Sequence, residues 1–395
     1  MPIFKKKYTI PNKFLTIDIN AEEIRCLAFY RENGNLKIIG SGKEPLERDV
    51  VRGGIIVDKR AVIGNLGNVV HDTLEEFGEK INNAIFGING DLCFENITTA
   101  KVTRDPQFPI SQYEVSGIYE RLEVAAKNQT QNIQMQYTGD SEEALNLVLS
   151  STVYTKLNNN KVSRMEGENA KQIEIAYYTA YSPSYHIKML KQVAKKARIQ
   201  VLAFAPKTFA LNKALTSSNL ENKDYVTIEV GSDYTSVAVV FGGGVVASQT
   251  LHIGYSHFVE TISQIMGLTY GEATKVLKTH IYGKLSQSES MVIQDCLGDV
   301  LDVWLEGLEI LFTEFSGVKT FAPTIYLFGK GSQLPEIMDT LDNNPWTKAI
   351  PFKAPPQIRK LELQDIGNIT DSTGTVTSNN WLSTATLASI IGELT

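Results

Sequence analysis

The sequence contains the same local pattern twice, and this duplication limits the possible folds more than any other feature. Runs of apolar and β-branched residues separated by polar turns give a strand–turn–strand pattern over 14–40 and again over 225–251. A pattern that recurs along a chain is typical of a fold assembled from related units. We therefore predict two α/β domains, each opening with a hairpin, with the turns around 17–28 and 228–239 facing each other across a cleft.

The segments that follow each hairpin support layered α/β domains. Apolar residues recur at helical spacing over 61–77, and a short apolar run at 84–88 predicts a buried strand. After the second hairpin, the sequence predicts helices over 255–266, 270–279 and 288–315 and a strand over 324–328. Helices that alternate with strands favour a sheet covered by helices in each domain. Gly242-Gly243-Gly244 is expected to be the turn of the second hairpin rather than a P-loop, because no Gly-Lys-Ser/Thr follows it.

The segment 104–182 does not continue this alternation. It predicts a helix over 111–127 and two strands, over 145–157 and 173–181. We interpret it as a small α+β unit inserted into the first domain. The predicted domains are 1–103 for the first part of domain one, 104–182 for the insertion, 183–222 for the completion of domain one, and 223–395 for domain two.

Composition excludes several classes of function. The net charge is −6 and the isoelectric point is about 5.6, so the chain lacks the overall positive charge that drives nucleic-acid binding. Cys26, Cys93 and Cys296 form no CxxC pair, which argues against a structural zinc site and fits a reducing cytoplasm. The five histidines have no metal-ligand spacing, and we interpret them as structural or surface residues.

A set of short motifs, in order along the chain, carries a resemblance to a known superfamily. They are Asp18-Ile19, Gly40-Ser41-Gly42, the segment 52–58, Glu229-Val230-Gly231 with Thr235, Gly254, the segment 268–273, and the segment 327–335. Together they resemble the actin, sugar-kinase and DnaK superfamily, and within it the FtsA type, which carries a small α+β subdomain in its first domain. The resemblance implies an actin-like two-domain ATPase fold made of ribonuclease-H-like repeats.

The FtsA resemblance also implies a function. It predicts a bacterial cell-division scaffold that links a division polymer such as FtsZ to the membrane, self-assembles into filaments, and resides in the cytoplasm at the inner face of the membrane. PilM, a platform protein of type IV pilus assembly with a similar insertion, is the alternative; it would dock a short peptide beside the insertion. A sugar-kinase-like phosphotransferase is the less favoured third reading, because no catalytic carboxylate facing a sugar pocket can be identified.

The same resemblance assigns candidate residues for ATP and magnesium. The nucleotide-binding candidates are Asp18, Asn20, Glu229, Gly231, Thr235, Gly254, Gly329, Gly331 and Ser332. Asp18 and Glu229 are the magnesium candidates, because acidic residues at the two hairpins hold the hydrated ion in this superfamily. The glycines would let the backbone approach phosphate and adenine closely.

Several of these positions depart from the family pattern. The changed positions are Asn20 in place of glycine, Glu229 in place of aspartate, Ser232-Asp233 in place of glycines, Lys330 in place of the second glycine of the adenosine loop, and Thr274 and Leu277 in place of charged residues. Asp233 is expected to be a turn residue and Lys330 an exposed loop lysine. Together the changes predict a weak or absent ATP site, and at most weak ATPase activity.

The two ends of the chain bear on membrane contact. The segment 1–7 combines apolar residues with three lysines, so it could touch anionic lipid, although a solvated tail is the simpler reading. The segment 381–394 is expected to cover the core as the last helix of the fold. The amphipathic membrane helix usual for FtsA proteins is therefore not visible.

Overall fold

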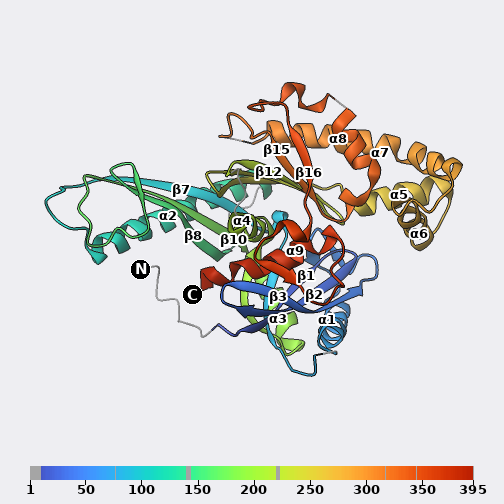
Figure 1. The fold of residues 1–395 in the computed structure, drawn as a ribbon, viewed down its shortest axis with the longest axis horizontal. Coiled ribbons are helices and arrows are strands. Elements are labelled where there is room, and N and C mark those ends of the chain that lie inside the picture. Colours follow the sequence, from blue (N-terminus) through green and yellow to red (C-terminus); the bar gives the residue numbers. More distant parts are fainter. Residues whose placement is uncertain are drawn as a thin grey trace.

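The computed structural model describes residues 10–75, 77–138, 144–218, 223–315, 317–343 and 345–394. The segment 1–7, considered above for lipid contact, lies outside the described residues. Figure 1 shows two large bodies, with an elongated insertion that projects to one side. Among the described residues, no helix is both long enough and apolar enough to cross a membrane.

The first domain is built on a six-stranded sheet with the order β11-β6-β1-β2-β3-β17. Its strands are β1 (Lys13–Ile19), β2 (Glu23–Glu32), β3 (Asn35–Pro45), β6 (Asn83–Ile88), β11 (Gln200–Pro206) and β17 (Ile369–Asp371). Its helices are α1 (Lys59–Leu74), α3 (Ser184–Lys196), α4 (Lys207–Ser217) and α9 (Leu382–Thr386). Strand β1 pairs antiparallel with β2 and parallel with β6.

The second domain repeats this arrangement in a five-stranded sheet with the order β14-β13-β12-β15-β16. Its strands are β12 (Tyr225–Val230), β13 (Thr235–Phe241), β14 (Gly244–Leu251), β15 (Thr324–Phe328) and β16 (Gln357–Lys360). Its helices are α5 (Tyr255–Met266), α6 (Tyr270–Ile281), α7 (Gln287–Thr313) and α8 (Pro335–Asn343). Strand β12 pairs antiparallel with β13 and parallel with β15, as β1 does with its neighbours, so the duplication is structural.

Short elements complete both domains. They are the two-stranded ribbon β4 (Val51–Arg52) and β5 (Ile55–Ile56), and the 3₁₀ helices Gly90–Leu92, Gly331–Gln333, Trp346–Ala349, Leu363–Asp365, Asn379–Trp381 and Leu387–Leu394. The turn between β13 and β14 is the expected glycine hairpin, in which Gly242 and Gly243 have φ of 60° and 84°. Such positive φ values suit glycine, which has no Cβ to clash.

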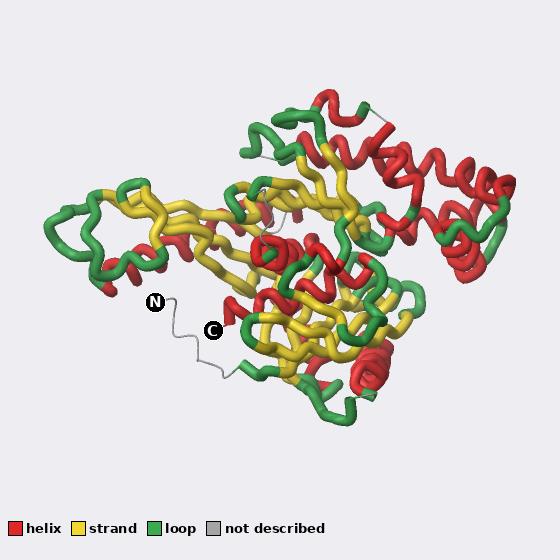
Figure 2. The backbone as a smooth tube through the Cα atoms, viewed as in Figure 1, coloured by secondary structure: helices red, strands yellow, loops and turns green. Residues whose placement is uncertain are grey.

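The insertion is a separate four-stranded sheet with the order β7-β10-β8-β9, covered by α2 (Gln112–Thr138). Its strands are β7 (Phe94–Thr103), β8 (Leu145–Leu157), β9 (Asn160–Val162) and β10 (Gln172–Pro183). Figure 2 shows these strands running outward from the body of the molecule. The sheet does not complete the first domain's sheet, which agrees with the predicted insertion. It begins earlier than the predicted residue 104, because β7 pairs with β10 along its whole length.

The end of the chain differs from the predicted second domain over 223–395. Strand β17 pairs with β3 of the first domain, and α9 packs against α4, β1 and β2. Leu382, Ala385, Leu387 and Ile390 are fully buried in the first domain's core. Burial of this apolar stripe against first-domain elements explains why the chain returns there. The expected helix over 381–394 is the short helix α9 followed by 3₁₀ turns.

Candidate functional site

The two hairpin turns point into the interface between the domains, as the duplicated pattern predicts. Asp18 lies near the end of β1 and Glu229 near the end of β12, and both are buried. They are close enough for the negative charge of Asp18 to contribute to the raised pKa of Glu229. The two candidate carboxyl groups therefore lie near each other at the interface between the domains.

A lysine that the sequence did not single out occupies the space beside these carboxyl groups. Lys207 is the first residue of α4, and its Nζ lies 2.6 Å from Asp18 Oδ1. The side chains are 4% and 2% exposed, so this is an ion pair shielded from water. The ammonium also donates to the hydroxyl of Tyr234 in the second domain at 3.3 Å. On the other side, Asn20 Nδ2 donates to Asp18 Oδ2 at 3.2 Å.

Glu229 has partners from within the chain as well. The hydroxyl of Ser383, on α9, donates to Glu229 Oε1 at 2.6 Å. Burial raises the pKa of Glu229, and the positive charge of Lys207 partly opposes this effect. The two predicted magnesium ligands are thus already close to one buried cation that the protein itself supplies.

A second lysine crosses the cleft near the β1–β2 turn. Lys330 Nζ lies 2.6 Å from Glu22 Oε2 and 4.0 Å from the ring centroid of Tyr255. Its side chain is only 13% exposed, so the prediction of an exposed loop lysine is wrong. Burial lowers the pKa of Lys330, and the charge of Glu22 opposes this effect. The pairing with Glu22 and the aromatic ring explains why the long side chain folds inward.

Asp233 is a turn residue, as expected, but its carboxylate also spans the cleft. The backbone N–H of Gly53, in the first domain, donates to Asp233 Oδ2 at 2.7 Å. A backbone N–H that could have faced an anion therefore already binds a carboxylate of the same chain. Gly53 has φ of +52°, which presents this N–H from the tight turn between β4 and β5.

The predicted nucleotide-binding glycines serve internal packing. A Cβ on Gly254 would lie 2.6 Å from the backbone nitrogen of Tyr234, and one on Gly331 would lie 2.3 Å from Val230 Cγ1. Gly231 and Gly329 face similarly close neighbours, at 3.1 Å and 2.6 Å. Glycine is thus required for the close approach of protein segments to one another, whether or not a ligand binds.

The predicted hydroxyl candidates are also hydrogen-bonded within the protein. Thr235 Oγ1 accepts from Trp304 Nε1 at 2.9 Å and donates to the carbonyl of Ile253 at 2.7 Å. Ser332 donates to the carbonyl of Gly329 at 2.7 Å and accepts from Asn379 at 3.1 Å. These residues stabilise the second domain and its contact with the C-terminal segment.

The residues in the cleft do not fit a magnesium nucleotide. Asp18 is paired with an ammonium, Glu229 is hydrogen-bonded to Ser383, and the Gly53 N–H binds Asp233. Across the described part of the chain, no group of three or more histidine, cysteine or acidic side chains is arranged to hold a metal ion. Sequence reasoning missed Lys207 because Pro206-Lys207 looks like an ordinary helix start, and nothing local marks its side chain as buried.

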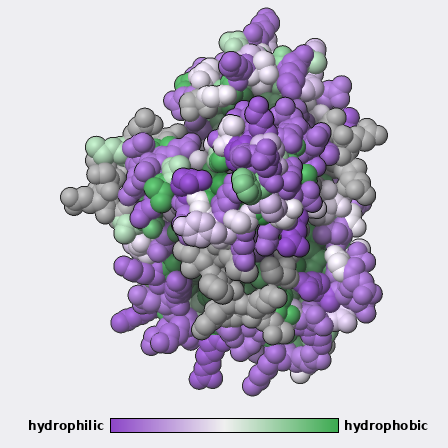
Figure 3. All heavy atoms as spheres, turned by 90° about the vertical axis from the view of Figure 1, so that its left-hand side faces the viewer, coloured by the Kyte–Doolittle hydropathy of each residue, from purple (hydrophilic) through white to green (hydrophobic). Residues whose placement is uncertain are grey.

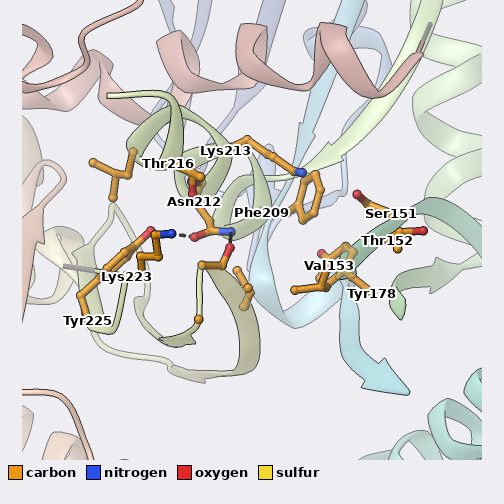
Figure 4. A pocket seen from close by; sticks show the side chains of 15 residues that line it. Ser151, Thr152, Val153, Tyr178, Phe209, Asn212, Lys213, Thr216, Lys223 and Tyr225 are labelled. Atoms are coloured by element: carbon orange, nitrogen blue, oxygen red, sulfur yellow. Dashed lines mark hydrogen bonds between the residues drawn. The ribbon is translucent and has the colours of Figure 1, made fainter. Parts of the chain in front are cut away.

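A groove outside the cleft offers a different site. It has a volume of about 430 Å³ and lies where strand β8 of the insertion, helix α4 and the β13–β14 turn meet (Figure 4). Its lining residues include Ser151, Thr152 and Val153 of β8. Beside the groove, β8 is irregular, because its register with β10 shifts at Val153 and leaves a bulge there.

In the described part of the chain, the edge of β8 away from β10 has no paired strand over much of its length, and β11 of the first domain lies near β8. Strand β9 pairs with β8 only at Thr155–Leu157, and among the described strands none pairs with that edge from residue 145 to 154. An open edge leaves backbone N–H and C=O groups able to pair with an added strand. Beside it, the rings of Tyr178 and Phe209 stack at 4.4 Å and give the groove an apolar wall.

Charged side chains and hydrogen-bonded side chains also line the groove. Lys213 and Lys223 line it, and Lys213 forms an ion pair with Glu393 at 2.7 Å. Asn212 accepts from the Tyr225 hydroxyl and donates to the carbonyl of Gly243, which fixes the wall opposite β8. The face of the molecule seen in Figure 3, on the side to which the insertion projects, is predominantly hydrophilic over its described side chains.

Comparison with known proteins identifies the fold. No protein-family model matches the sequence, and no curated protein matches it significantly. A solved PilM–PilN type IV pilus biogenesis complex matches with a TM-score of 0.65 and 13% identity, covering 97% of this chain and 99% of that one. The ethanolamine utilization protein EutJ from Carboxydothermus hydrogenoformans matches with a TM-score of 0.52 and 10% identity, covering 97% and 91%. The chain therefore has the actin-like ATPase fold predicted from its sequence.

Proposed function

We propose that this protein is a docking scaffold without efficient catalysis, which binds an extended peptide of a partner protein in the groove between β8, α4 and the β13–β14 turn. The open edge of β8 is the observation on which the proposal depends. Main-chain pairing with such an edge supplies affinity, and neighbouring pockets select side chains. The cleft supports the non-enzymatic part, because its two candidate carboxyl groups are held by Lys207 and Ser383.

The partner class follows from the fold and from the groove. The solved PilM structure is a complex with PilN, so a PilM-like platform role at the inner face of the membrane is the first candidate. Lys223 favours a peptide that carries an acidic side chain, since the charge of Lys213 is paired with Glu393. The cell-division role, with an FtsZ-like partner and filament formation, remains a prediction of the sequence motifs, and an FtsZ-like peptide is the second probe.

Blocking the groove should weaken peptide binding. We expect Thr216→Arg to weaken binding by about tenfold or more, equivalent to about 1.4 kcal/mol, because the long side chain would fill the space beside β8. The probes are fluorescein-labelled peptides: the cytoplasmic N-terminal segments of membrane proteins encoded beside this gene, and the C-terminal segment of the FtsZ-like protein of the same genome. Fluorescence polarisation on the full chain gives the affinity.

Ser217→Arg is the matched control. Thr216 and Ser217 are adjacent on α4, and each hydroxyl donates to the carbonyl four residues earlier, at 2.7 Å and 2.9 Å. Ser217 lines a different hollow, so we expect its substitution to leave peptide affinity unchanged. Binding of the FtsZ-like peptide alone would select the division role. Equal weakening by both variants, or no binding of any probe, would contradict the docking proposal.

A further inference from the structure

We propose that the interdomain cleft is a latch that works without nucleotide: the ammonium of Lys207 takes the place of the metal ion between the two hairpins and, together with Lys330, holds the domains closed. This goes beyond the docking role and does not depend on it. The proposal rests on where each charged group originates, how deeply it is buried, and what it contacts.

The first step is that Lys207 joins elements of both domains. It begins α4 in the first domain, pairs with Asp18 on β1, and donates to Tyr234 in the β12–β13 turn. A buried carboxylate needs a counter-charge, which magnesium can supply in an intact site of this fold. Here the ammonium supplies it permanently, because it is part of the chain.

The second step is that further contacts join the first domain to the second. Lys330 of the second domain pairs with Glu22 of the first, and the Gly53 N–H of the first pairs with Asp233 of the second. At the rim, Arg48 lies 2.7 Å from Glu260, although this exposed pair adds little. On both hairpins, turn residues therefore contact the opposite domain.

The third step is that these contacts exclude a triphosphate. A phosphate oxygen would compete with Asp233 for the Gly53 N–H and would bring negative charge close to the carboxylates of Asp233 and Asp18. Like charges that meet in a partly dry cleft repel strongly. An entering nucleotide would also have to break the Lys207–Asp18 ion pair before a metal could reach Asp18.

Two measurements on the full wild-type chain test the proposal. Calorimetry with Mg-ATP up to millimolar concentration should show no binding heat. Small-angle X-ray scattering should give the same radius of gyration with and without Mg-ATP, because the domains are already closed. Binding with a micromolar dissociation constant, or a measurable compaction on adding Mg-ATP, would overturn the proposal.

Variants then test the latch itself. Lys207→Met and Lys330→Met should each speed amide hydrogen exchange of Gly53 and of the two hairpin turns by tenfold or more, because the domains separate more often. Lys213→Met is the control, because Lys213 also lies on α4 but its ion pair, with Glu393, includes no residue of either hairpin. If Lys207→Met does not fold, Lys330→Met alone decides the matter. Exchange rates at Gly53 as slow as in the control would refute the latch.

Discussion

Replacing Lys207 by methionine should lower the free energy of unfolding by about 3–5 kcal/mol, because the substitution leaves Asp18 buried without its counter-charge. Methionine keeps much of the length and the apolar stem of lysine, so little packing is lost. The Lys207–Asp18 pair is almost completely shielded from water, and solvent cannot replace the missing charge. Urea denaturation at pH 7, followed by circular dichroism, measures the change.

Lys213→Met serves as the control for this prediction. It removes the same charge from the same helix, but its ion pair with Glu393 is partly exposed, with side-chain exposures of 29% and 24%. We expect a loss of about 1 kcal/mol or less. Asp18→Asn combined with Lys207→Met should be less destabilised than the sum of the single substitutions, because the double variant no longer buries the charge of Asp18 without its partner. Equal losses for Lys207→Met and Lys213→Met would refute a special role for the buried pair.

The hairpins could be predicted because their signals are local. Strand β12 and its turn follow from an apolar run of β-formers that ends in Gly-Ser-Asp, and the pairing of neighbouring strands needs only a short turn. The positions of Asp18 and Glu229 at the cleft follow from the same pattern. The motif glycines allow protein segments to pack closely in this structure, and their role toward a nucleotide stays a prediction.

The side-chain pairings between the two domains could not be predicted, because each joins residues that are distant in sequence. Lys207 begins a helix of ordinary appearance, and its partner Asp18 lies on the first strand of the chain. Lys330 folds inward because Glu22 and Tyr255 surround it, and neither is near it in sequence. An exposed lysine is the usual outcome for such a loop, and only tertiary structure reverses it.

The domain boundaries were missed for a related reason. Residues 94–103, which form β7, fall within the predicted first domain, 1–103, because a single strand carries no information about which sheet it joins. Strand β17 is only three residues long, and it pairs in parallel with β3, from the other end of the chain. A short parallel pairing between distant segments leaves almost no periodic signal.

Glu95→Ala is expected to have the second large effect on stability. Glu95 lies on β7, and its buried carboxyl group accepts hydrogen bonds from the hydroxyls of Tyr178 on β10, Thr208 on α4 and Ser248 on β14. Ser248 donates at 2.9 Å. One side chain thus connects the insertion, the first domain and the second. Alanine would leave the buried hydroxyl of Tyr178 and the partly buried hydroxyls of Thr208 and Ser248 without this acceptor, at about 1 kcal/mol each, so we expect a loss of about 3 kcal/mol.

The contribution of the Glu95 carboxyl group to stability should depend on pH in a way that distinguishes it from an ordinary surface carboxylate. Burial raises the pKa of Glu95 above its usual 4.5, and the three hydroxyl donors only partly oppose this. The contribution of Glu95 to stability is therefore fully present below about pH 4.5 and declines as pH rises through the raised pKa. In denaturation experiments, Glu95→Gln should lower the free energy of unfolding more at pH 5 than at pH 8. Glutamine never carries the buried charge, so only the wild-type protein loses the contribution of this side chain as pH rises.

Glu174 provides the opposite case within the same insertion. It accepts hydrogen bonds from Lys156 and Tyr154, and these lower its pKa to about 2. Its contribution is present above pH 4.5 and disappears as pH falls towards 2. The loss of stability caused by Glu174→Gln should therefore shrink as pH falls from 5 to 3.

The opposite result at Glu95 would contradict the prediction for that residue. If Glu95→Gln lost more stability at pH 8 than at pH 5, the carboxyl group that joins the insertion to the two domains would stabilise the fold in its ionised form, and burial would not control its charge.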